Sequence, residues 1–377
     1  MNHRGHEVYH PVPLSHPEPR PIQLKERHLQ FSKPAADSHC NAPENPAGQG
    51  RIQVKYSPAA AGSIQSPGLL AVIRFGATPT QRETSAEGGP LRLDVRLKPL
   101  NSPPYVECWL ANGAVRQGRR DSIRYAHDGD YLFAVAELDE REHSGVCAAA
   151  EALYAQINRF QQVSGFPHLL RIWNYLDAIN EGNGDAERYR QFCMGRAAGF
   201  VDIGANRFPA ASAIGHRHTT HMLQVYWLAS RTPGTHVENP RQVSAYRYPR
   251  THGPVSPSFA RATLAADGTL LISGTASIVG HLSMHAGDPL AQLDETLRNL
   301  AALGAPVLHA SDHAGALPSS NSVLLKAYVR DTAHVDAIAQ RVQAAFPDSP
   351  VLYLAADICR RELLLEIEMV RLGVCRT

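Results

Sequence analysis

The sequence predicts an α+β fold made of two copies of one unit, each a mixed sheet with helices packed on one face. One observation is an internal repeat, in which β-branched apolar runs and amphipathic helical segments follow the same order twice. A second is the length of 377 residues, which suggests two to three domains. A third is the hydrophobic content of 44%, which is enough for sizeable cores.

Composition places a tail before the two copies. Residues 1–50 contain 8 of the 27 prolines and 6 of the 19 histidines, and they show no apolar periodicity. Such a segment buries too little apolar surface to offset the entropy of ordering, so a flexible tail is expected. The expected division is a tail at 1–50, a first unit at 51–235 and a second unit at 236–377.

The first copy contains one helix that the periodicity marks clearly. Apolar side chains recur at helical spacing through residues 146–163, and Gly165 suits the left-handed position after a helix end. A second helix is expected near 185–198, and the segment 231–256 is expected to connect the copies. Short runs rich in β-branched or aromatic residues predict strands at 68–76, 105–110, 130–138, 168–176 and 221–229.

The second copy repeats this order. Residues 268–281 combine β-branched residues with glycine turns and predict a strand and a loop. Asp288 and Pro289 suit the N-cap and first position of a helix, which Gly304 is expected to end. The elements that follow are predicted to be a strand at 323–330, a helix at 335–346, and strands at 350–356 and 362–370.

Charge and hydropathy argue against two classes of partner. There are 37 basic and 35 acidic residues, a net charge of +2, and charged residues make up only 19% of the chain. This balance disfavours a nucleic-acid or anionic-membrane binder, and no apolar run approaches the roughly 20 residues of a membrane span. The six cysteines show no C-x-x-C spacing and the N-terminus has no apolar leader, so reduced thiols and a cytoplasmic location are expected.

Three histidines in the first copy raise the question of a metal site. His216, His218 and His221 form an H-x-H-x-x-H pattern, and histidines two apart share one face of a strand. No nearby carboxylate or cysteine completes a ligand set, so no metal site is predicted. Phosphate-binding GxxxxGK[ST] and serine-hydrolase G-x-S-x-G motifs are also absent from the sequence.

Longer motifs carry a family resemblance. The second copy resembles the Rid/YjgF family through SGTASIVG, DETLRNLAAL, LLKAYVRD and LLLEIEMV, and the first copy resembles it more faintly. The Rid imine deaminases carry a substrate-binding arginine where this chain has PDSPVLYL, which argues against that activity. The tandem pair resembles the chorismatase family, through GFPHLLRIWNYLDAIN, ERYRQFCMGR, SPSFARA, SGTASIVGH and DICRRELLLEIE, over about residues 50–377.

This resemblance implies two tandem Rid/YjgF-like domains and an enzyme without a cofactor. Chorismatases cleave chorismate to pyruvate and a cyclic carboxylic acid, so chorismate is the expected substrate. Single-domain Rid proteins form trimers, which leaves a monomer or a homotrimer as the expected assembly. A Rid-like protein that binds a small molecule without turnover is the alternative from another class.

Glu366 is the expected catalytic residue. Period two along ELLLEIEMV places Glu366 and Glu368 on one face of a strand. The resemblance gives the first glutamate of this strand the acid–base role, and Glu368 is expected to be structural. A carboxylic acid whose pKa is raised by partial burial can protonate the enolpyruvyl ether near neutral pH.

Two positions are linked by the resemblance to the ring product. Cys359 resembles the residue found at this position in members that release 3-hydroxybenzoate. Ala276 resembles the residue found at its position in the hydrolytic members, which release 3,4-dihydroxycyclohexa-1,5-dienoate. The two indications disagree. Mixed patterns resemble members that form hydroxybenzoates, so 3-hydroxybenzoate is favoured, with 4-hydroxybenzoate and the hydrolytic product as alternatives.

A dianionic substrate requires cations in its site, and the guanidinium fork suits carboxylates best. Arg171 and Lys326 occupy matching positions in the two copies, on the strand faces of Trp173 and Tyr328. An aromatic ring beside a cation can form the floor of a ring-binding pocket. The expected substrate-binding residues are Arg171, Arg261, Lys326, Tyr328 and Arg330, and Arg188 and Arg196 are further candidates.

Overall fold

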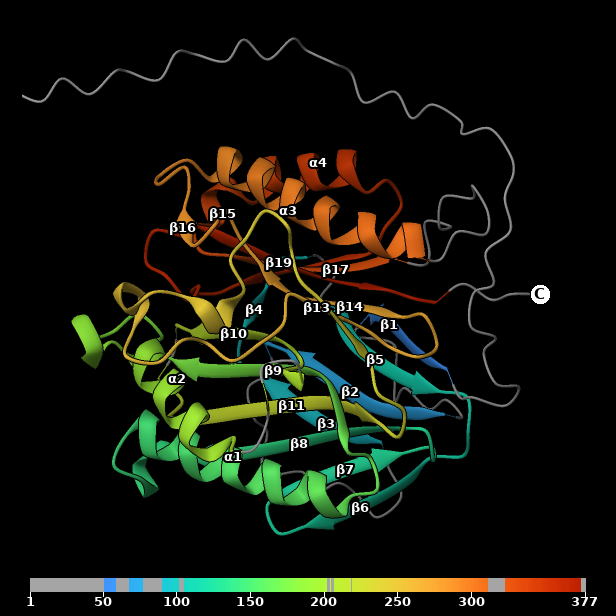
Figure 1. Ribbon diagram of the computed structural model, residues 1–377. Helices are drawn as coiled ribbons and strands as arrows, with labels where there is room; N and C mark the ends of the chain where they lie inside the picture. Colours follow the sequence, from blue (N-terminus) through green and yellow to red (C-terminus); the bar gives the residue numbers. More distant parts are fainter. Residues whose placement is uncertain are drawn as a thin grey trace, which may run out of the picture. The chain divides into compact units, whose positions relative to one another are not determined.

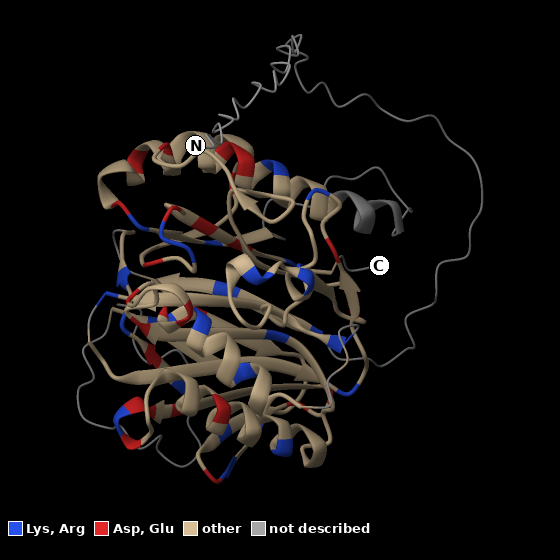
Figure 2. Cartoon of the chain, turned by 60° about the vertical axis from the view of Figure 1, so that its left-hand side comes forward, with Lys and Arg blue, Asp and Glu red and all other residues tan. Residues whose placement is uncertain are grey.

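The computed structural model describes residues 51–58, 68–76, 90–101, 105–201, 204, 207–217, 219–310 and 323–373, without the side chains of 305–310. The expected tail at 1–50 lies outside the described residues, and the division at residue 235 stays a prediction. Basic and acidic positions are interspersed over the described elements (Figure 2). Within the described residues, we find no helix long and apolar enough to cross a bilayer.

The predicted duplication is confirmed, and with it the α+β class. The first unit runs β8 (Tyr131–Asp139), α1 (Val146–Val163), β9 (His168–Asp177), α2 (Arg188–Gly199), β10 (Ala210–His216) and β11 (Met222–Ser230). The second runs β14 (Leu270–Thr275), α3 (Pro289–Ala310), β17 (Val323–Val329), α4 (Val335–Ala345), β18 (Val351–Ala355) and β19 (Leu365–Arg371). The two sheets share one strand order, β10-β9-β11-β8 matching β18-β17-β19-β14 (Figure 1).

Short strands extend both sheets at their edges. The first sheet continues from β8 into β7 (Ile123–His127) and β6 (Arg116–Arg120). The second continues from β14 into β13 (Ala262–Leu264) and β12 (Thr235–Val237), and β4 (Lys98–Pro99) pairs with β18 at its other edge. A small hairpin, β15 (Ile278–Val279) with β16 (Leu282–Ser283), and 3-10 turns at Glu140–Glu142, Gly184–Ala186, Ala245–Arg247, Arg250–His252 and Thr332–His334 complete the described elements.

A third sheet differs from the expected arrangement. The strands predicted at 68–76 and 105–110 do form, but they join a separate four-stranded sheet in the order β1-β5-β2-β3. Its members are β1 (Ile52–Pro58), β5 (Tyr105–Ala111), β2 (Leu69–Phe75) and β3 (Leu91–Val95). Apolar runs predict strands but not which sheet a strand joins, because pairing partners are distant in sequence.

One hydrophobic core is shared by all three sheets. Trp109 of the third sheet packs against Trp173 of the first, and Trp173 stacks on Tyr226 with ring centroids 4.7 Å apart. Tyr328 and Leu352 bring the second sheet into the same core. Separate cores lie between each duplicated sheet and its helices, α1 and α2 for the first and α3 and α4 for the second (Figure 1).

Two glycines set the position of α2. A Cβ atom on Gly195 would lie 1.9 Å from the Cys147 carbonyl oxygen, and one on Gly199 would lie 2.3 Å from that of Glu151. Only glycine allows such an approach of two helix backbones, so α2 lies directly on α1. This contact places the face of α2 that carries Cys193 and Arg196 beside the second unit.

Helix α3 is longer than expected, and β10 is among the strands that were not predicted. Helix α3 continues through Gly304 to Ala310, because an interior glycine costs a helix only about 1 kcal/mol and the flanking residues favour helix. Strand β10 was not predicted, because its sequence AASAIGH is rich in alanine and lacks the bulky residues that mark strands.

Candidate active site

A cavity of about 400 Å³ opens where the two units meet. Its walls come from α2, from β10, from the segment before β13, from β14 and from residues 359–366. The two units are joined beside it, since Ala211 N donates to Ser273 Oγ at 2.8 Å and Gly274 N donates to Ser212 Oγ at 2.9 Å. A site at this position takes side chains from both copies.

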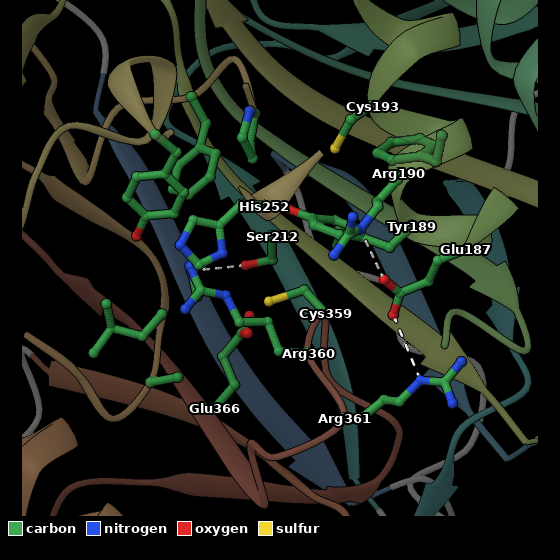
Figure 3. A pocket seen from close by; sticks show the side chains of 18 of the residues that line it. Glu187, Tyr189, Arg190, Cys193, Ser212, His252, Cys359, Arg360, Arg361 and Glu366 are labelled. Carbon is green, nitrogen blue, oxygen red and sulfur yellow. Dashed lines mark hydrogen bonds and ion pairs between the residues drawn. The ribbon is translucent and has the colours of Figure 1, made fainter. Parts of the chain in front are cut away.

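Glu366 forms part of the cavity wall (Figure 3). It lies on β19, is 4% exposed, and its carboxyl group occupies the space over Gly274. A Cβ atom on Gly274 would be 1.7 Å from Glu366 Oε1 and 3.0 Å from Ser212 Oγ. The β14–β19 register shifts between Ile272 and Thr275, so this glycine lies in a β-bulge, a feature that often redirects a strand beside an active site.

The environment of Glu366 keeps its carboxyl group protonated. Burial raises the pKa to about 8, with a further contribution from the negative charge of Glu368, while Arg171 and Arg261 oppose the rise. A carboxylic acid with such a pKa is largely neutral at pH 7 and can donate a proton to a bound substrate. The environment of Glu366 is therefore consistent with its expected role as a general acid.

Five arginines line the cavity, namely Arg190, Arg196, Arg261, Arg360 and Arg361. Arg196 is 4% exposed, and among the described residues its Nε and Nη2 atoms have no hydrogen-bond partner. The Arg196 guanidinium stacks over Tyr154 at 5.1 Å from the ring centroid. Buried donors without partners are costly, so these two are ready for an anionic group of a ligand.

Arg261 is the second buried cation of the wall. Its Nη2 atom donates to Val243 O at 2.8 Å and to Tyr248 Oη at 2.7 Å, and its guanidinium lies between the rings of Tyr248 and Phe259. Its Nε atom has no partner among the described residues. The other arginines are held at the rim, where Arg190 Nε donates to Glu187 at 3.1 Å.

The structure brings four of the predicted site residues together in the cavity wall, namely Glu366, Arg261, Ala276 and Cys359. Of the further candidates, Arg196 joins them, whereas Arg188 donates to Glu140 and to the Asp177 carbonyl group. Burial raises the pKa of the Cys359 thiol to about 12, so this thiol is neutral.

The remaining four predicted substrate-binding residues lie outside this wall. Arg171 and Lys326 are 1% and 2% exposed and both bind Glu368 in the shared core. Tyr328 Oη lies 3.1 Å from Tyr175 Oη in the same core. Arg330 pairs with Asp357 at 2.7 Å and caps the Leu363 carbonyl group. Alternation placed Arg171 on the strand face of Trp173 and Lys326 on that of Tyr328, but these faces meet the third sheet rather than a ligand pocket.

Several residues of the site were not predicted. Ser212 lies on the unpredicted β10, and Tyr248 and His252 lie in the segment expected only to connect the copies. His252 Nε2 lies 3.0 Å from His281 Nδ1, and burial, with help from Arg360, lowers the pKa of His252 to about 4. Gly274 could have been found, because a glycine inside a strand pattern indicates a bulge or a close approach.

Two histidines of the H-x-H-x-x-H pattern, His216 and His221, are described, and within the described residues we find no group of three metal-ligating side chains. His216 is 1% exposed, and burial lowers its pKa to about 4. His221 is exposed at the start of β11, and His218 lies outside the described residues.

Comparison with known proteins agrees with this geometry. The family model of the N-terminal part of FkbO/Hyg5-like chorismatases matches residues 107–229. A 3-hydroxybenzoate synthase of Streptomyces hygroscopicus is 35% identical over 80% of this chain and 91% of its own length. A chorismatase of Streptomyces rapamycinicus is 36% identical over 76% of this chain and 87% of its own length. A chorismatase crystal structure covers 85% of this chain and 98% of its own, with 33% identity and a TM-score of 0.75. The chain belongs to the chorismatase family.

Proposed function

We propose that the protein cleaves the enolpyruvyl ether of chorismate and releases pyruvate and a hydroxybenzoate. The observation that supports this most directly is a buried, neutral carboxylic acid, Glu366, in the wall of a cavity. The same cavity presents guanidinium donors that have no partner among the residues the structure describes. The test is incubation of the purified protein with chorismate and measurement of pyruvate. Absence of pyruvate release would leave only the binding-protein alternative.

Glu366 supplies the proton in the proposed mechanism. Protonation of the enol methylene carbon makes the side chain a good leaving group, and it departs as pyruvate when its bond to ring carbon C3 breaks. The neighbouring 4-hydroxyl oxygen attacks C3 and returns its proton to Glu366, which leaves a 3,4-epoxide. Opening of the epoxide moves a proton from the ring carbon to the epoxide oxygen, overall, and gives the aromatic hydroxybenzoate, so the acid is regenerated and no water is consumed.

Arg196 and Arg261 hold the two carboxylates in this proposal. Replacing Arg196 with lysine keeps the charge but removes the planar fork, so we expect kcat/KM for chorismate to fall about 10- to 100-fold, mainly through KM. The matched control is Arg190→Lys at the rim, where a Glu187 partner already occupies the guanidinium and the change should be under about threefold. Equal effects of the two substitutions in steady-state kinetics would contradict the assignment.

Ala276 and Cys359 are proposed to determine the ring product. Both line the cavity, and Ala276 is fixed because Asn299 Nδ2 donates to its carbonyl oxygen at 3.0 Å. A neutral thiol and a small neighbour make an apolar wall that disfavours water and leaves the 4-hydroxyl group as the nucleophile. We propose 3-hydroxybenzoate as the main product, with 4-hydroxybenzoate as a second.

The Ala276→Gly variant tests this proposal. Removing the methyl group lets the ring sit deeper, so we expect the share of 3-hydroxybenzoate over 3,4-dihydroxycyclohexa-1,5-dienoate to rise severalfold. Chromatography of the ring products from chorismate measures the ratio. An unchanged product ratio, at a comparable rate of pyruvate release, would show that residue 276 does not determine the ring product.

The assembly and location stay proposals. Here the third sheet packs with the two duplicated sheets around one core within a single chain. This favours a monomer over a homotrimer. The cytoplasmic location expected from the sequence is retained as part of the proposal, with chorismate as the only partner.

A further inference from the structure

Glu368, two residues beyond the proposed acid, is bound by four donors in the shared core. Its Oε2 atom accepts from Arg171 Nη2 at 2.7 Å and from Ser212 Oγ at 2.8 Å. Its Oε1 atom accepts from Trp173 Nε1 at 2.8 Å and lies 2.8 Å from Lys326 Nζ. These four donors take up all of the lone pairs of the carboxylate, so Glu368 is held ionised at a fixed position.

The cluster around Glu368 carries no net charge. Lys326 Nζ also pairs with Glu107 of β5 at 2.5 Å, and Glu107 accepts from Trp109 Nε1 at 2.6 Å. Two cations, Arg171 and Lys326, are thereby matched by two carboxylates, and all four are at most 5% exposed. The cluster joins all three sheets. Each of its positive charges is already paired with a carboxylate of the cluster.

The cluster reaches the active site through Ser212. The Ser212 hydroxyl group donates to Glu368, accepts from Arg171 Nη2 at 2.6 Å, and accepts from Gly274 N at 2.9 Å. Gly274 is the residue whose open side is filled by the Glu366 carboxyl group. The Ser212 hydroxyl group thus lies between the neutral acid and the ion cluster, and Glu366 and Glu368 lie two residues apart on one face of β19.

We propose that Glu368 is a positioning residue for Glu366, because it holds Arg171 and Lys326 in a neutral cluster and so prevents a cation from pairing with the Glu366 carboxyl group. This inference rests on the proposed role of Glu366 as proton donor. It adds that a structural ion cluster in the core sets the protonation state of the acid.

The charges around Glu366 agree with this role. Glu368 on the same strand favours its neutral form, whereas Arg171 of β9 and Arg261 before β13 favour its ionised form. Cys359 and Tyr189 also face it, and burial raises the pKa of each, so both are uncharged. Burial also acts on Glu368, but Lys326 and Arg171 outweigh it and lower the pKa of this carboxyl group. One glutamate of the pair is therefore held ionised and the other neutral.

The test is the pH dependence of kcat for pyruvate release between pH 6 and 10 in two variants. In Glu368→Gln, Arg171 is released toward Glu366, so the pH at which the rate falls to half should move down by about one unit or more. In Arg171→Gln, the cation is lost while Glu368 remains, so the same midpoint should move up. The midpoint does not depend on the fraction of enzyme that is folded, whereas a purely structural role would change only the amount of activity.

Glu137→Gln is the matched control, because it removes a carboxylate that pairs with Arg124 outside the cluster and should leave the midpoint in place. If Glu368→Gln fails to fold, the upward shift in Arg171→Gln alone supports the proposal. Midpoints equal to that of the wild type in both folded variants, or shifts in one common direction, would overturn it. If Glu366 is not the proton donor, a Glu366→Gln variant will keep the wild-type rate of pyruvate release. That result is distinct from the pH shifts that test the role of Glu368.

Discussion

Replacing Glu366 with glutamine is expected to lower kcat for pyruvate release from chorismate by about 10²- to 10⁴-fold, the usual contribution of a general acid. Glutamine has nearly the same shape and can fill the space over Gly274, but it has no proton to give to the enol carbon. Binding of chorismate, measured by calorimetry, should stay within about threefold, since the arginines of the wall are unchanged.

Glu362→Gln is the matched control for this variant. Glu362 lines the same cavity but is exposed and accepts a hydrogen bond from Ser283, so its loss should change kcat by less than about threefold. A Glu366→Gln protein that binds chorismate and keeps the wild-type rate would eliminate the proposed acid. A wild-type protein with no rate at all would favour the non-catalytic alternative.

The same substitution has a consequence for stability. A carboxyl group whose pKa is about 8 when folded, against 4.5 as an ordinary glutamate, stabilises the fold fully below pH 4.5. That contribution is lost as the pH rises toward 8, because the unfolded chain then releases a proton that the folded chain keeps. Between low pH and pH 8, the free energy of unfolding of the wild type should therefore fall by about 2–5 kcal/mol through this group. The Glu366→Gln variant should lack this fall, which unfolding measurements at both pH values would show.

Gly274→Ala is expected to be nearly as damaging to activity. Its new methyl carbon would lie 1.7 Å from Glu366 Oε1, which is an impossible contact, and 3.0 Å from Ser212 Oγ. The Glu366 side chain must therefore leave its position, and a misplaced acid loses most of its contribution. We expect kcat to fall at least about 100-fold, measured by pyruvate release after thermal unfolding has shown a folded protein.

Two further variants separate this clash from a general effect of removing a glycine. Gly304→Ala makes the same change inside α3, where no described atom outside the helix's own backbone lies within 4 Å of the new methyl group, and should leave the rate unchanged. The double variant Gly274→Ala with Glu366→Asp shortens the acid and makes room for the methyl group. It should be more active than Gly274→Ala alone, and a double variant without any gain would show that the clash is not the cause.

The fold was predictable where the signal is local. Helical spacing in residues 146–163 and alternation in 323–330 depend on neighbouring residues, and both elements form nearly as expected. The duplication was also visible, because both copies keep one order of elements. The third sheet was not, since β1, β2, β3 and β5 pair over long separations that no short pattern encodes.

The site was predictable only in part. Glu366, Arg261, Ala276 and Cys359 lie in motifs that the family resemblance covers, and all four reach the cavity. The resemblance gave Glu366, Ala276 and Cys359 their roles, whereas Arg261 and Arg330 were chosen as cations for a dianionic substrate. Arg171, Lys326 and Tyr328 were chosen because they lie on a charged or aromatic strand face. Such a face predicts that residues share surroundings, and the surroundings here are a core between sheets. Whether a buried cation meets a ligand or a carboxylate depends on distant residues such as Glu107.

The most direct test of the account is the pH profile of kcat for the wild-type protein at saturating chorismate. A neutral acid with a pKa of about 8 predicts a level rate below pH 7 and a tenfold fall for each pH unit above about 8. A rate that stays level or increases through pH 9.5 would contradict the claim, because the reacting group would then have to be an ionised base.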